Sequence, residues 1–135
     1  MKELTIDATI ENIPIVTDFV NEQLGGLGCS VKIQRQIDIA IDELFGNIAL
    51  YAYNPETGTA TVCVELTEEP LAVIITFINN GVPYDPLKKD DPDIVLSAEE
   101  REIGGLGIYM VKKSMDGISY EYKDGKNILS IMKKL

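Results

Sequence analysis

The sequence predicts a single domain of the α/β class, an α+β two-layer sandwich with a mixed, mostly antiparallel sheet and three helices on one face. Two observations predict this architecture. Segments with helical spacing of apolar residues and segments of β-branched residues follow one another in the order βα, α, ββ, loop, α, ββ. The chain has 135 residues and is 45% hydrophobic, which suffices for one core but hardly for two. We therefore expect residues 1–135 to form one domain.

The first half of the chain predicts one strand and two helices. Apolar and polar residues alternate over residues 4–10, as in a strand with one buried face. Asn12 is the expected N-cap of a helix that ends at the glycines after residue 24. Ser30 is expected to cap a longer helix, which an Asn-Pro pair at 54–55 ends.

The second half predicts two hairpins and one helix. Residues 59–67 and 71–77 are rich in β-branched side chains and are joined by a Glu-Glu-Pro turn. A third helix follows a glycine-rich string and ends near Met115. Residues 118–122 and 127–132 then flank an Asp-Gly pair, a typical turn between antiparallel strands.

The charge balance narrows the possible partners. Asp and Glu number 22 against 12 Lys and Arg, which gives a formal net charge of −10. Such a surface repels nucleic-acid backbones and anionic membranes, so we expect the chain to bind neither. No apolar stretch is long enough to span a bilayer or to resemble a secretion signal, which favours a cytoplasmic protein.

Two residue types bear on the chemistry. Cys29 and Cys63 lack the paired spacing of a metal site or a redox motif, so we interpret both as free structural thiols. The chain contains no histidine, so the usual general base and metal ligand is missing. Any catalysis must therefore use carboxylates, amides, lysines or a metal ion.

The glycine-rich string before the third helix is the first candidate site. Gly104, Gly105, Leu106 and Gly107 stand where the helix begins. Glycine lets successive backbone N–H groups converge on an anion, and the partial positive charge of a helix N-terminus adds to the attraction. The string therefore indicates a phosphate-binding loop, although a tight turn alone would use the same residues.

The second helix carries a candidate polar pair. Glu43 and Asn47 are four residues apart, so they share one side of the helix, on the shoulder between its apolar stripe and solvent. Asn47 can offer a neutral oxygen to Mg²⁺, and Glu43 can accept a proton. The alternative is a solvated helix face. Asp38 and Asp42 lie on the other side and are interpreted as solubilising charges or part of a partner surface.

A polar segment ends the second strand of the first hairpin. Asn79 could accept a hydrogen bond from the exocyclic amine of adenine through its side-chain oxygen, and Gly81 would let a flat ring approach closely. The alternative is a plain turn. Tyr84 and Asp85 are expected to anchor a long polar loop that runs from about residue 83 to 103. Loops of this length in compact domains are commonly lids or binding loops.

Together these motifs resemble those of a known family. The chain is similar to the small anti-sigma factor serine/threonine kinases of bacteria, which carry the histidine-kinase-like (GHKL) ATPase domain. The motifs that resemble the N-box, the first glycine box and the second glycine box are, in this order, Glu43-x-x-x-Asn47, Asn79-x-Gly81-x-Pro83 and Gly104-Gly105-Leu106-Gly107. Their order, with a lid between the glycine boxes, makes the resemblance specific, and it covers nearly the whole chain. It implies the Bergerat-type ATP-binding fold.

The resemblance also implies a role for each residue. Glu43 would be the catalytic base that activates the attacking hydroxyl, and Asn47 would hold Mg²⁺ against the phosphates of ATP. Asn79 would face adenine. The other residues expected to bind ATP are Gly81, Pro83, Arg101 (the only arginine of the lid), Gly104, Gly105, Leu106 and Gly107.

The function implied by the resemblance is that of a kinase that phosphorylates an anti-sigma-factor antagonist and regulates a sigma factor. The antagonist domain and the sigma factor would be its partners, and its assembly would be a homodimer. One residue departs from the family pattern, because Asn79 replaces the aspartate that reads adenine. This substitution leaves open a non-catalytic, nucleotide-responsive module that sequesters a regulatory partner. A detached sensor-kinase domain would need a partner chain that supplies a histidine.

Overall fold

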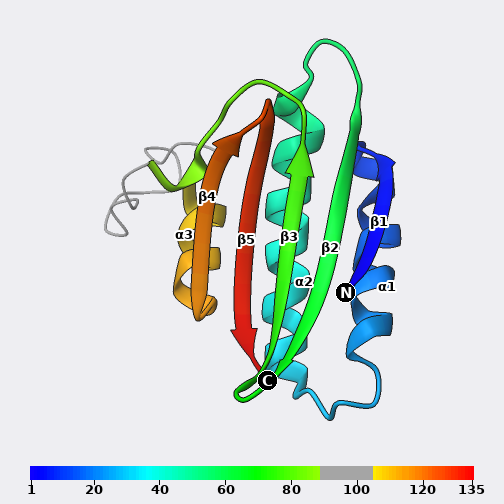
Figure 1. Cartoon of the computed structure of the whole chain (residues 1–135), viewed down its shortest axis with the longest axis vertical. Coiled ribbons are helices and arrows are strands. Elements are labelled where there is room, and N and C mark those ends of the chain that lie inside the picture. The colour runs from blue at the N-terminus through cyan, green and yellow to red at the C-terminus, as the bar shows by residue number, and fades with distance from the viewer. Residues whose placement is uncertain (89–104) are drawn as a thin grey trace.

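A five-stranded sheet forms one layer of the protein, and helices cover one of its faces (Figure 1). The computed structural model describes residues 1–88 and 105–135. The main elements are β1 (Lys2–Asp7), α1 (Ile13–Leu24), α2 (Val31–Asn47), β2 (Thr59–Glu68), β3 (Leu71–Asn79), α3 (Gly105–Ser114), β4 (Gly117–Lys123) and β5 (Lys126–Lys134). Short helical turns are η1 (Ile10–Asn12), η2 (Ile48–Ala52) and η3 (Pro86–Lys88). The predicted α+β fold with three helices on one face of the sheet is confirmed for these residues.

The strand order is β1-β2-β3-β5-β4, and each neighbouring pair is antiparallel. The sequence allowed for a mixed sheet, but the described strands include no parallel pair. The reason is the position of β5. The connection through α3 joins β3 to β4, and β5 lies between these two strands, so they run in the same direction without pairing.

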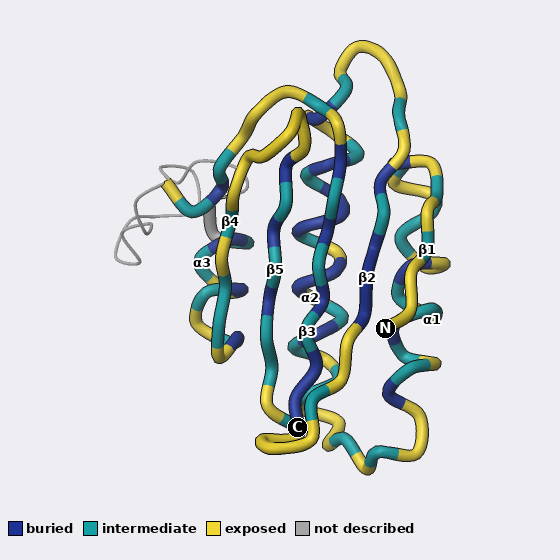
Figure 2. Tube along the Cα trace, in the orientation of Figure 1, coloured by how far each residue is buried: buried dark blue, intermediate teal, exposed yellow. Residues whose placement is uncertain are grey.

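The core lies between the sheet and α2, which runs along the middle of the helical layer (Figure 2). On β3, the side chains of Val73, Ile75 and Phe77 face the helices and are each 1% exposed. On α2, Ile37 and Phe45 are fully buried. Burial of one side chain of this size stabilises the fold by about 1.5–3 kcal/mol, so this layer fixes α2 on the sheet.

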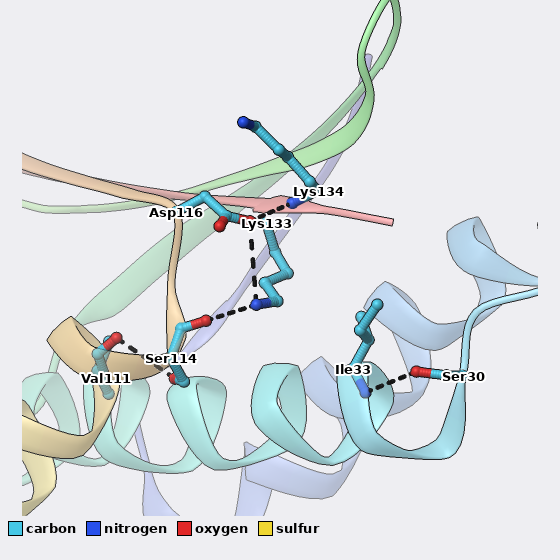
Figure 3. A network of polar contacts seen from close by, with 7 residues as sticks. All are labelled: Ser30, Ile33, Val111, Ser114, Asp116, Lys133 and Lys134. Atoms are coloured by element: carbon cyan, nitrogen blue, oxygen red, sulfur yellow. Dashed lines mark hydrogen bonds and ion pairs between the residues drawn. The ribbon is translucent and has the colours of Figure 1, made fainter.

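The start of α2 agrees with the prediction, and its end does not. The Ser30 hydroxyl oxygen accepts a hydrogen bond from the backbone N–H of Ile33 at 3.2 Å (Figure 3). After Asn47, the helix continues as the π-helical turn η2 rather than as an α-helix up to the Asn-Pro pair. Wide turns of this kind are frequent near functional sites.

Asn12 holds the N-cap position of α1, as predicted, but its side chain does not make the capping hydrogen bond. Asn12 has helical backbone angles, and its Nδ2 donates instead to the carbonyl oxygen of Asp7 at 2.9 Å. The turn η1 continues into α1 without a break, so the first turn of α1 follows an existing helical turn. The hydrogen bond from Asn12 connects η1 to the end of β1.

A polar network joins the end of α3 to β5 (Figure 3). Lys133 Nζ donates to the carbonyl oxygen of Ser114 at 2.7 Å and lies 3.9 Å from a carboxylate oxygen of Asp116. The same carboxylate accepts from the backbone N–H of Lys134 at 2.6 Å. A lysine ammonium at a helix C-terminus also interacts favourably with the helix dipole. The network thereby fixes the turn from α3 into β4.

The turn between β4 and β5 has the backbone that its sequence predicts. Asp124 and Gly125 have φ values of 53° and 77°. Positive φ at both central residues is typical of the tight hairpin turn that matches the twist of antiparallel strands. The turn brings Asn127 to the same end of the sheet as the end of β3, where it pairs with Asn79.

Both cysteines are free thiols, as predicted. Cys63 is buried on β2, and its thiol donates to a carboxylate oxygen of Glu3 at 3.7 Å. Burial, followed by the negative charge of Glu3, raises the pKa of the Cys63 thiol. Among the described residues, no helix combines the length and the apolar character that crossing a membrane requires.

Candidate functional site

A cavity of about 50 Å³, open to solvent on one side, lies where η2, the end of β3 and the start of β5 meet. These segments come together at the upper end of the molecule in Figure 1. The lining residues are Leu44, Asn47, Ile48, Tyr51, Ala52, Phe77, Asn79, Val82, Tyr84, Pro86, Tyr120, Asn127 and Leu129. Apolar and aromatic walls with a few polar groups are typical of small-molecule sites.

Two asparagines form the polar wall of the cavity. Asn79 and Asn127 face each other across β3 and β5, and they are 7% and 5% exposed. Asn127 Nδ2 donates to Asn79 Oδ1 at 3.1 Å and to the carbonyl oxygen of Val82 at 3.0 Å. The Asn127 side-chain oxygen accepts from the backbone N–H of Tyr84 at 3.1 Å and from the Tyr120 hydroxyl. The pair thus ties the loop after β3 to the β4-β5 hairpin.

This geometry corrects one expectation for Asn79. Its Oδ1 accepts from the backbone N–H of Gly81 at 2.9 Å as well as from Asn127 Nδ2. A carbonyl oxygen has two lone pairs, and both are engaged. Asn79 lies in the cavity as predicted, but its oxygen is not free to accept a hydrogen bond from an adenine amine.

Gly81 allows the backbone after β3 to pack closely on the backbone of Ala52. A β-carbon on Gly81 would overlap the backbone carbonyl of Ala52 at the end of η2. The backbone N–H of Val82 donates to the same carbonyl at 3.0 Å. Only glycine permits this approach. Gly81 itself does not line the cavity, and it shapes the wall by holding the loop against η2. Pro83 is exposed and also lies outside the lining.

Tyr53 holds a second part of the same wall. Its hydroxyl donates to the carbonyl oxygen of Thr59 at 2.6 Å and accepts from the backbone N–H of Asn80 at 2.9 Å. A β-carbon on Gly58 would overlap the Tyr53 ring, so the ring packs directly on that backbone. Tyr53 therefore connects the segment after η2 to the end of β3.

Glu43 and Gly107 lie in direct contact. A β-carbon on Gly107 would overlap the Glu43 carboxylate. Asn47 Nδ2 donates to Glu43 Oε1 at 3.4 Å, one helical turn further along α2. Glu43 and Asn47 are both half-buried, as their position on the helix shoulder predicts. The structure thus brings the predicted polar pair of α2 to the first turn of α3, with Asn47 lining the cavity and Glu43 just outside it.

The glycine-rich string is helical over its described part. Gly105, Leu106 and Gly107 form the first turn of α3, where the sequence predicted a loop. The N–H groups of a first helical turn have no partner within the helix, so this start still offers backbone donors and partial positive charge to an anion. Arg101 and Gly104 lie outside the described residues.

The residues present fit Mg²⁺ only as a partial ligand set. Among the described residues, no group of three or more Cys, Asp or Glu side chains could hold a metal ion by itself. Because Asn47 donates through Nδ2, its side-chain oxygen is available to a cation. One or two protein oxygens, completed by phosphate and water oxygens, are what Mg²⁺ takes at a nucleotide site. The donor set therefore fits Mg²⁺ bound together with phosphates.

The sequence analysis missed Asn127 and Tyr120. Asn127, Leu129 and Ile131 alternate along the helix-facing side of β5. A polar residue in this otherwise apolar series was a signal in the sequence for a buried polar contact. Tyr120 donates to Asn127 from β4. Burial raises the pKa of the Tyr120 hydroxyl, the Asp85 carboxylate adds to this, and the backbone of Tyr84 works against it. The hydroxyl is therefore a donor at neutral pH.

Tyr84 and Asp85 lie at the described start of the polar loop, and their role as anchors of the lid stays a prediction. The backbone N–H of Tyr84 donates to Asn127, and the Asp85 carboxylate accepts from the backbone N–H of Leu87 at 2.9 Å, within the turn that contains η3. These contacts hold the described start of the polar loop, residues 83–88, against the cavity. The rest of the predicted lid lies outside the residues that the structure describes.

Comparisons with known proteins identify a family and several relatives. A family model described as "Histidine kinase-like ATPase domain" matches residues 6–133. The serine/threonine-protein kinase BtrW of Bordetella bronchiseptica is 26% identical over 102 residues, which cover 76% of this chain and 71% of that protein. The serine-protein kinase RsbW of Staphylococcus epidermidis is 23% identical over an alignment of 139 residues, which covers 97% of this chain and 84% of that protein.

One solved structure has the same fold. The crystal structure of the RsbU and RsbW domains of Rv1364c from Mycobacterium tuberculosis superposes with a TM-score of 0.65 at 17% sequence identity. The match covers 100% of this chain and 33% of that longer chain. This likeness extends over all elements of the sheet and helices described above.

Proposed function

The chain belongs to the histidine kinase-like ATPase domain family, and from this premise we propose that it is a serine/threonine protein kinase that uses Mg²⁺ and ATP. The observation that carries the proposal is the contact of the Glu43 carboxylate with Gly107. It places a carboxylate beside the N-terminus of α3, and Asn47, one turn away, lines an apolar cavity that is open to solvent.

Each predicted residue has a proposed task in this arrangement. The base of ATP would occupy the apolar cavity next to Asn79, with Gly81 holding the wall behind it. The phosphates would lie toward the first turn of α3, near Gly105 and Gly107, where backbone N–H groups stabilise anions. Asn47 would hold Mg²⁺, whose chemistry is to neutralise phosphate charge. For Pro83, Leu106 and Gly104, binding to ATP remains an expectation from the resemblance. For Arg101, contact with the terminal phosphate or with a partner is an expectation from its position in the lid.

In the proposed reaction, the hydroxyl oxygen of a partner serine attacks the γ-phosphorus of ATP. A bond forms between these two atoms, the bond from the phosphorus to the β,γ-bridging oxygen breaks, and ADP leaves. The hydroxyl proton passes to the Glu43 carboxylate. Because phosphoryl transfer depends mainly on positioning and charge neutralisation, a chain of net charge −10 needs the helix N-terminus and the cation to offset its own field.

The proposed partners follow from the family resemblance and from the names of the relatives. BtrW and RsbW are named as serine/threonine- and serine-protein kinases. We extend this activity to the present chain, with an anti-sigma-factor antagonist domain as the phosphorylated protein and a sigma factor as the regulated partner. The proposed setting is a homodimer in the cytoplasm, without direct contact to nucleic acid or membrane.

A second candidate function is a nucleotide-responsive module that sequesters its partner without phosphoryl transfer. The Asn79 oxygen favours this second function, because both of its lone pairs are engaged and it cannot accept a hydrogen bond from the adenine amine. A base without that hydrogen bond would be held less exactly for phosphoryl transfer. The two functions differ in the role of Glu43: the kinase needs it as the base for phosphoryl transfer, and the sequestering module does not.

The test is a transfer assay with γ-labelled ATP, Mg²⁺ and an antagonist domain encoded next to this chain. Glu43→Gln keeps the shape of the side chain but removes the base, so we expect at least a hundredfold loss of serine phosphorylation. ADP should still raise the melting temperature of this variant. Glu22→Gln, an exposed change on α1, is the control and should transfer as the unaltered chain does. Nucleotide binding without any transfer would favour the module, and no binding by ATP or ADP at millimolar concentration would refute both functions.

A further inference from the structure

The orientation of two buried side-chain amides near the end of β3 is fixed by backbone donors. The N–H of Tyr84 can only donate, and it donates to the Asn127 side-chain oxygen at 3.1 Å. The Asn127 amide must therefore turn its Nδ2 toward Asn79, whose oxygen accepts from it at 3.1 Å. Independently, the N–H of Gly81 donates to the same Asn79 oxygen at 2.9 Å. Both amides are thus oriented without ambiguity.

One polar group of Asn79 is left for a ligand. Its oxygen has both lone pairs engaged, so the remaining group is the Nδ2 amine with its two hydrogens. Within the described part of the chain, no residue accepts a hydrogen bond from this amine. Asn79 is 7% exposed and lines the cavity. The cavity wall therefore offers a hydrogen-bond donor at this position.

We propose that Asn79, oriented by Asn127, makes this site prefer a purine nucleotide with an acceptor at position 6, a 6-oxopurine, over an adenine nucleotide. The proposal rests on the proposed function, which places the purine in the cavity with position 6 next to Asn79. Adenine carries an amine there, so two donors would face each other. The 6-oxo group of hypoxanthine or guanine accepts the Asn79 N–H instead.

The other side-chain amides of the cavity offer the base no hydrogen-bond acceptor next to the Asn79 amine. Asn127 uses its oxygen for Tyr84 and Tyr120 and its nitrogen for Asn79 and nearby carbonyl groups. Asn47 lies on α2 and donates to Glu43, at the end proposed for the phosphates. Among the side-chain amides that line the cavity in the described part of the chain, Asn79 is therefore the one with a free donor at the end of β3. A buried donor left without an acceptor loses the free energy of its hydrogen bond to water.

An aspartate at position 79 would reverse the preference. A carboxylate oxygen could accept from the Gly81 N–H and from Asn127 Nδ2 as the amide oxygen does, so the inner contacts remain. The second carboxylate oxygen would then replace the amine at the cavity and offer an acceptor. Asn79→Asp therefore changes one atom that faces the ligand and leaves the packing nearly constant.

The experiment is calorimetric titration of the whole chain with ADP and with IDP, whose bases differ at position 6 and in the protonation of N1. We expect IDP to bind the unaltered chain about two- to tenfold more tightly than ADP, the range that one matched hydrogen bond gives. Asn79→Asp should bind ADP more tightly than IDP. Asn80→Asp adds the same charge at the exposed neighbouring residue and should keep the preference of the unaltered chain.

Three results would overturn the inference. Tighter binding of ADP than of IDP by the unaltered chain, or equal binding, refutes it and leaves the nucleotide site of the proposed function standing. The same holds if Asn79→Asp folds, as judged by its melting temperature, but keeps the IDP preference. If neither nucleotide binds at millimolar concentration, the proposed function fails and the base preference fails with it.

Discussion

The Glu43 carboxylate lies in the space that a β-carbon on residue 107 would occupy. Gly107 is therefore the residue that permits α2 and α3 to approach each other at this point, and it sets the position of Glu43. The contact joins two motifs that are 64 residues apart, from residue 43 to residue 107. The same carboxylate accepts a hydrogen bond from Asn47 Nδ2 at 3.4 Å, so it connects the first turn of α3 to the residue that lines the cavity.

Gly107→Ala should displace the Glu43 carboxylate. A β-carbon at this position overlaps the far end of a flexible side chain, so the expected cost lies at the low end of that for overpacking, about 1 kcal/mol. We expect a lower melting temperature and, if the proposed kinase activity holds, at least a tenfold loss of phosphoryl transfer. Thermal unfolding and the transfer assay measure the two effects.

The matched control for this prediction is Gly46→Ala on α2. There the added β-carbon would meet only the Ile13 side chain, at 3.9 Å, which is ordinary contact. Since alanine is the better helix former, this variant should be more stable by about 0.5–1 kcal/mol. A Gly107→Ala variant as stable and as active as the unaltered chain would show that Glu43 moves away without cost.

Tyr53→Phe should loosen the wall around the end of β3. The change removes one hydroxyl that makes two hydrogen bonds, to Thr59 at 2.6 Å and from Asn80 at 2.9 Å, and leaves the ring on Gly58. We expect a loss of about 1–2 kcal/mol in the free energy of unfolding, measured by urea denaturation. Tyr122→Phe removes an exposed hydroxyl from β4 and serves as the control. Equal stabilities of the two variants would contradict the prediction.

Asn127→Asp should destabilise the protein more than any other one-atom change at the cavity. The new carboxylate oxygen would face the oxygens of Asn79, Gly81 and Val82, which now accept from Asn127 Nδ2. A buried charge among acceptors costs about 2–4 kcal/mol. Denaturation at pH 7 measures this loss, and Asn80→Asp is the exposed control. The deficit should shrink as the pH falls, because a protonated carboxyl can donate again.

The elements of the fold could be predicted because their signals are local. Alternation over residues 4–10, the β-branched runs before and after residue 70, and the Asp-Gly turn all lie within short stretches of sequence. Ser30 could be recognised as a cap for the same reason. At Asn12 the position could be recognised but the absence of the capping hydrogen bond could not, since η1 continues into α1 and removes the need for a side-chain cap.

The candidate site could be predicted only in part, because its geometry is set between elements. The motif strings indicated Glu43, Asn47 and Asn79 one by one. The Asn79–Asn127 pair joins residues 48 positions apart, and it depends on the register of β3 against β5. The Gly81 N–H engages one lone pair of the Asn79 oxygen locally, but the second is engaged by Asn127, which no string around residue 79 could reveal.

A pair of side chains between α1 and α2 gives the last prediction. Asn21 Nδ2 donates to the Asp38 carboxylate at 3.4 Å, while Asn21 Oδ1 is buried without a hydrogen-bond partner among the described residues. Partial burial raises the pKa of Asp38, and the hydrogen bond from Asn21 opposes this. The folded state therefore binds the Asp38 proton more tightly than the unfolded chain does. As the pH rises above the ordinary carboxyl pKa, about 4, ionisation of Asp38 removes stability.

Asp38→Asn should therefore stabilise the protein at pH 7. The new amide keeps an oxygen for Asn21 Nδ2, removes the partly buried charge and can donate to Asn21 Oδ1. Because Asp38 is partly solvated, we expect a gain of only about 0.5–1 kcal/mol. The gain should decrease from pH 7 to pH 4, where Asp38 of the unaltered chain becomes protonated, and urea denaturation at several pH values measures this slope. Asp42→Asn, an exposed change on the same helix, is the control. A gain that is independent of pH would mean that the added hydrogen bond, and not the titration of Asp38, causes it.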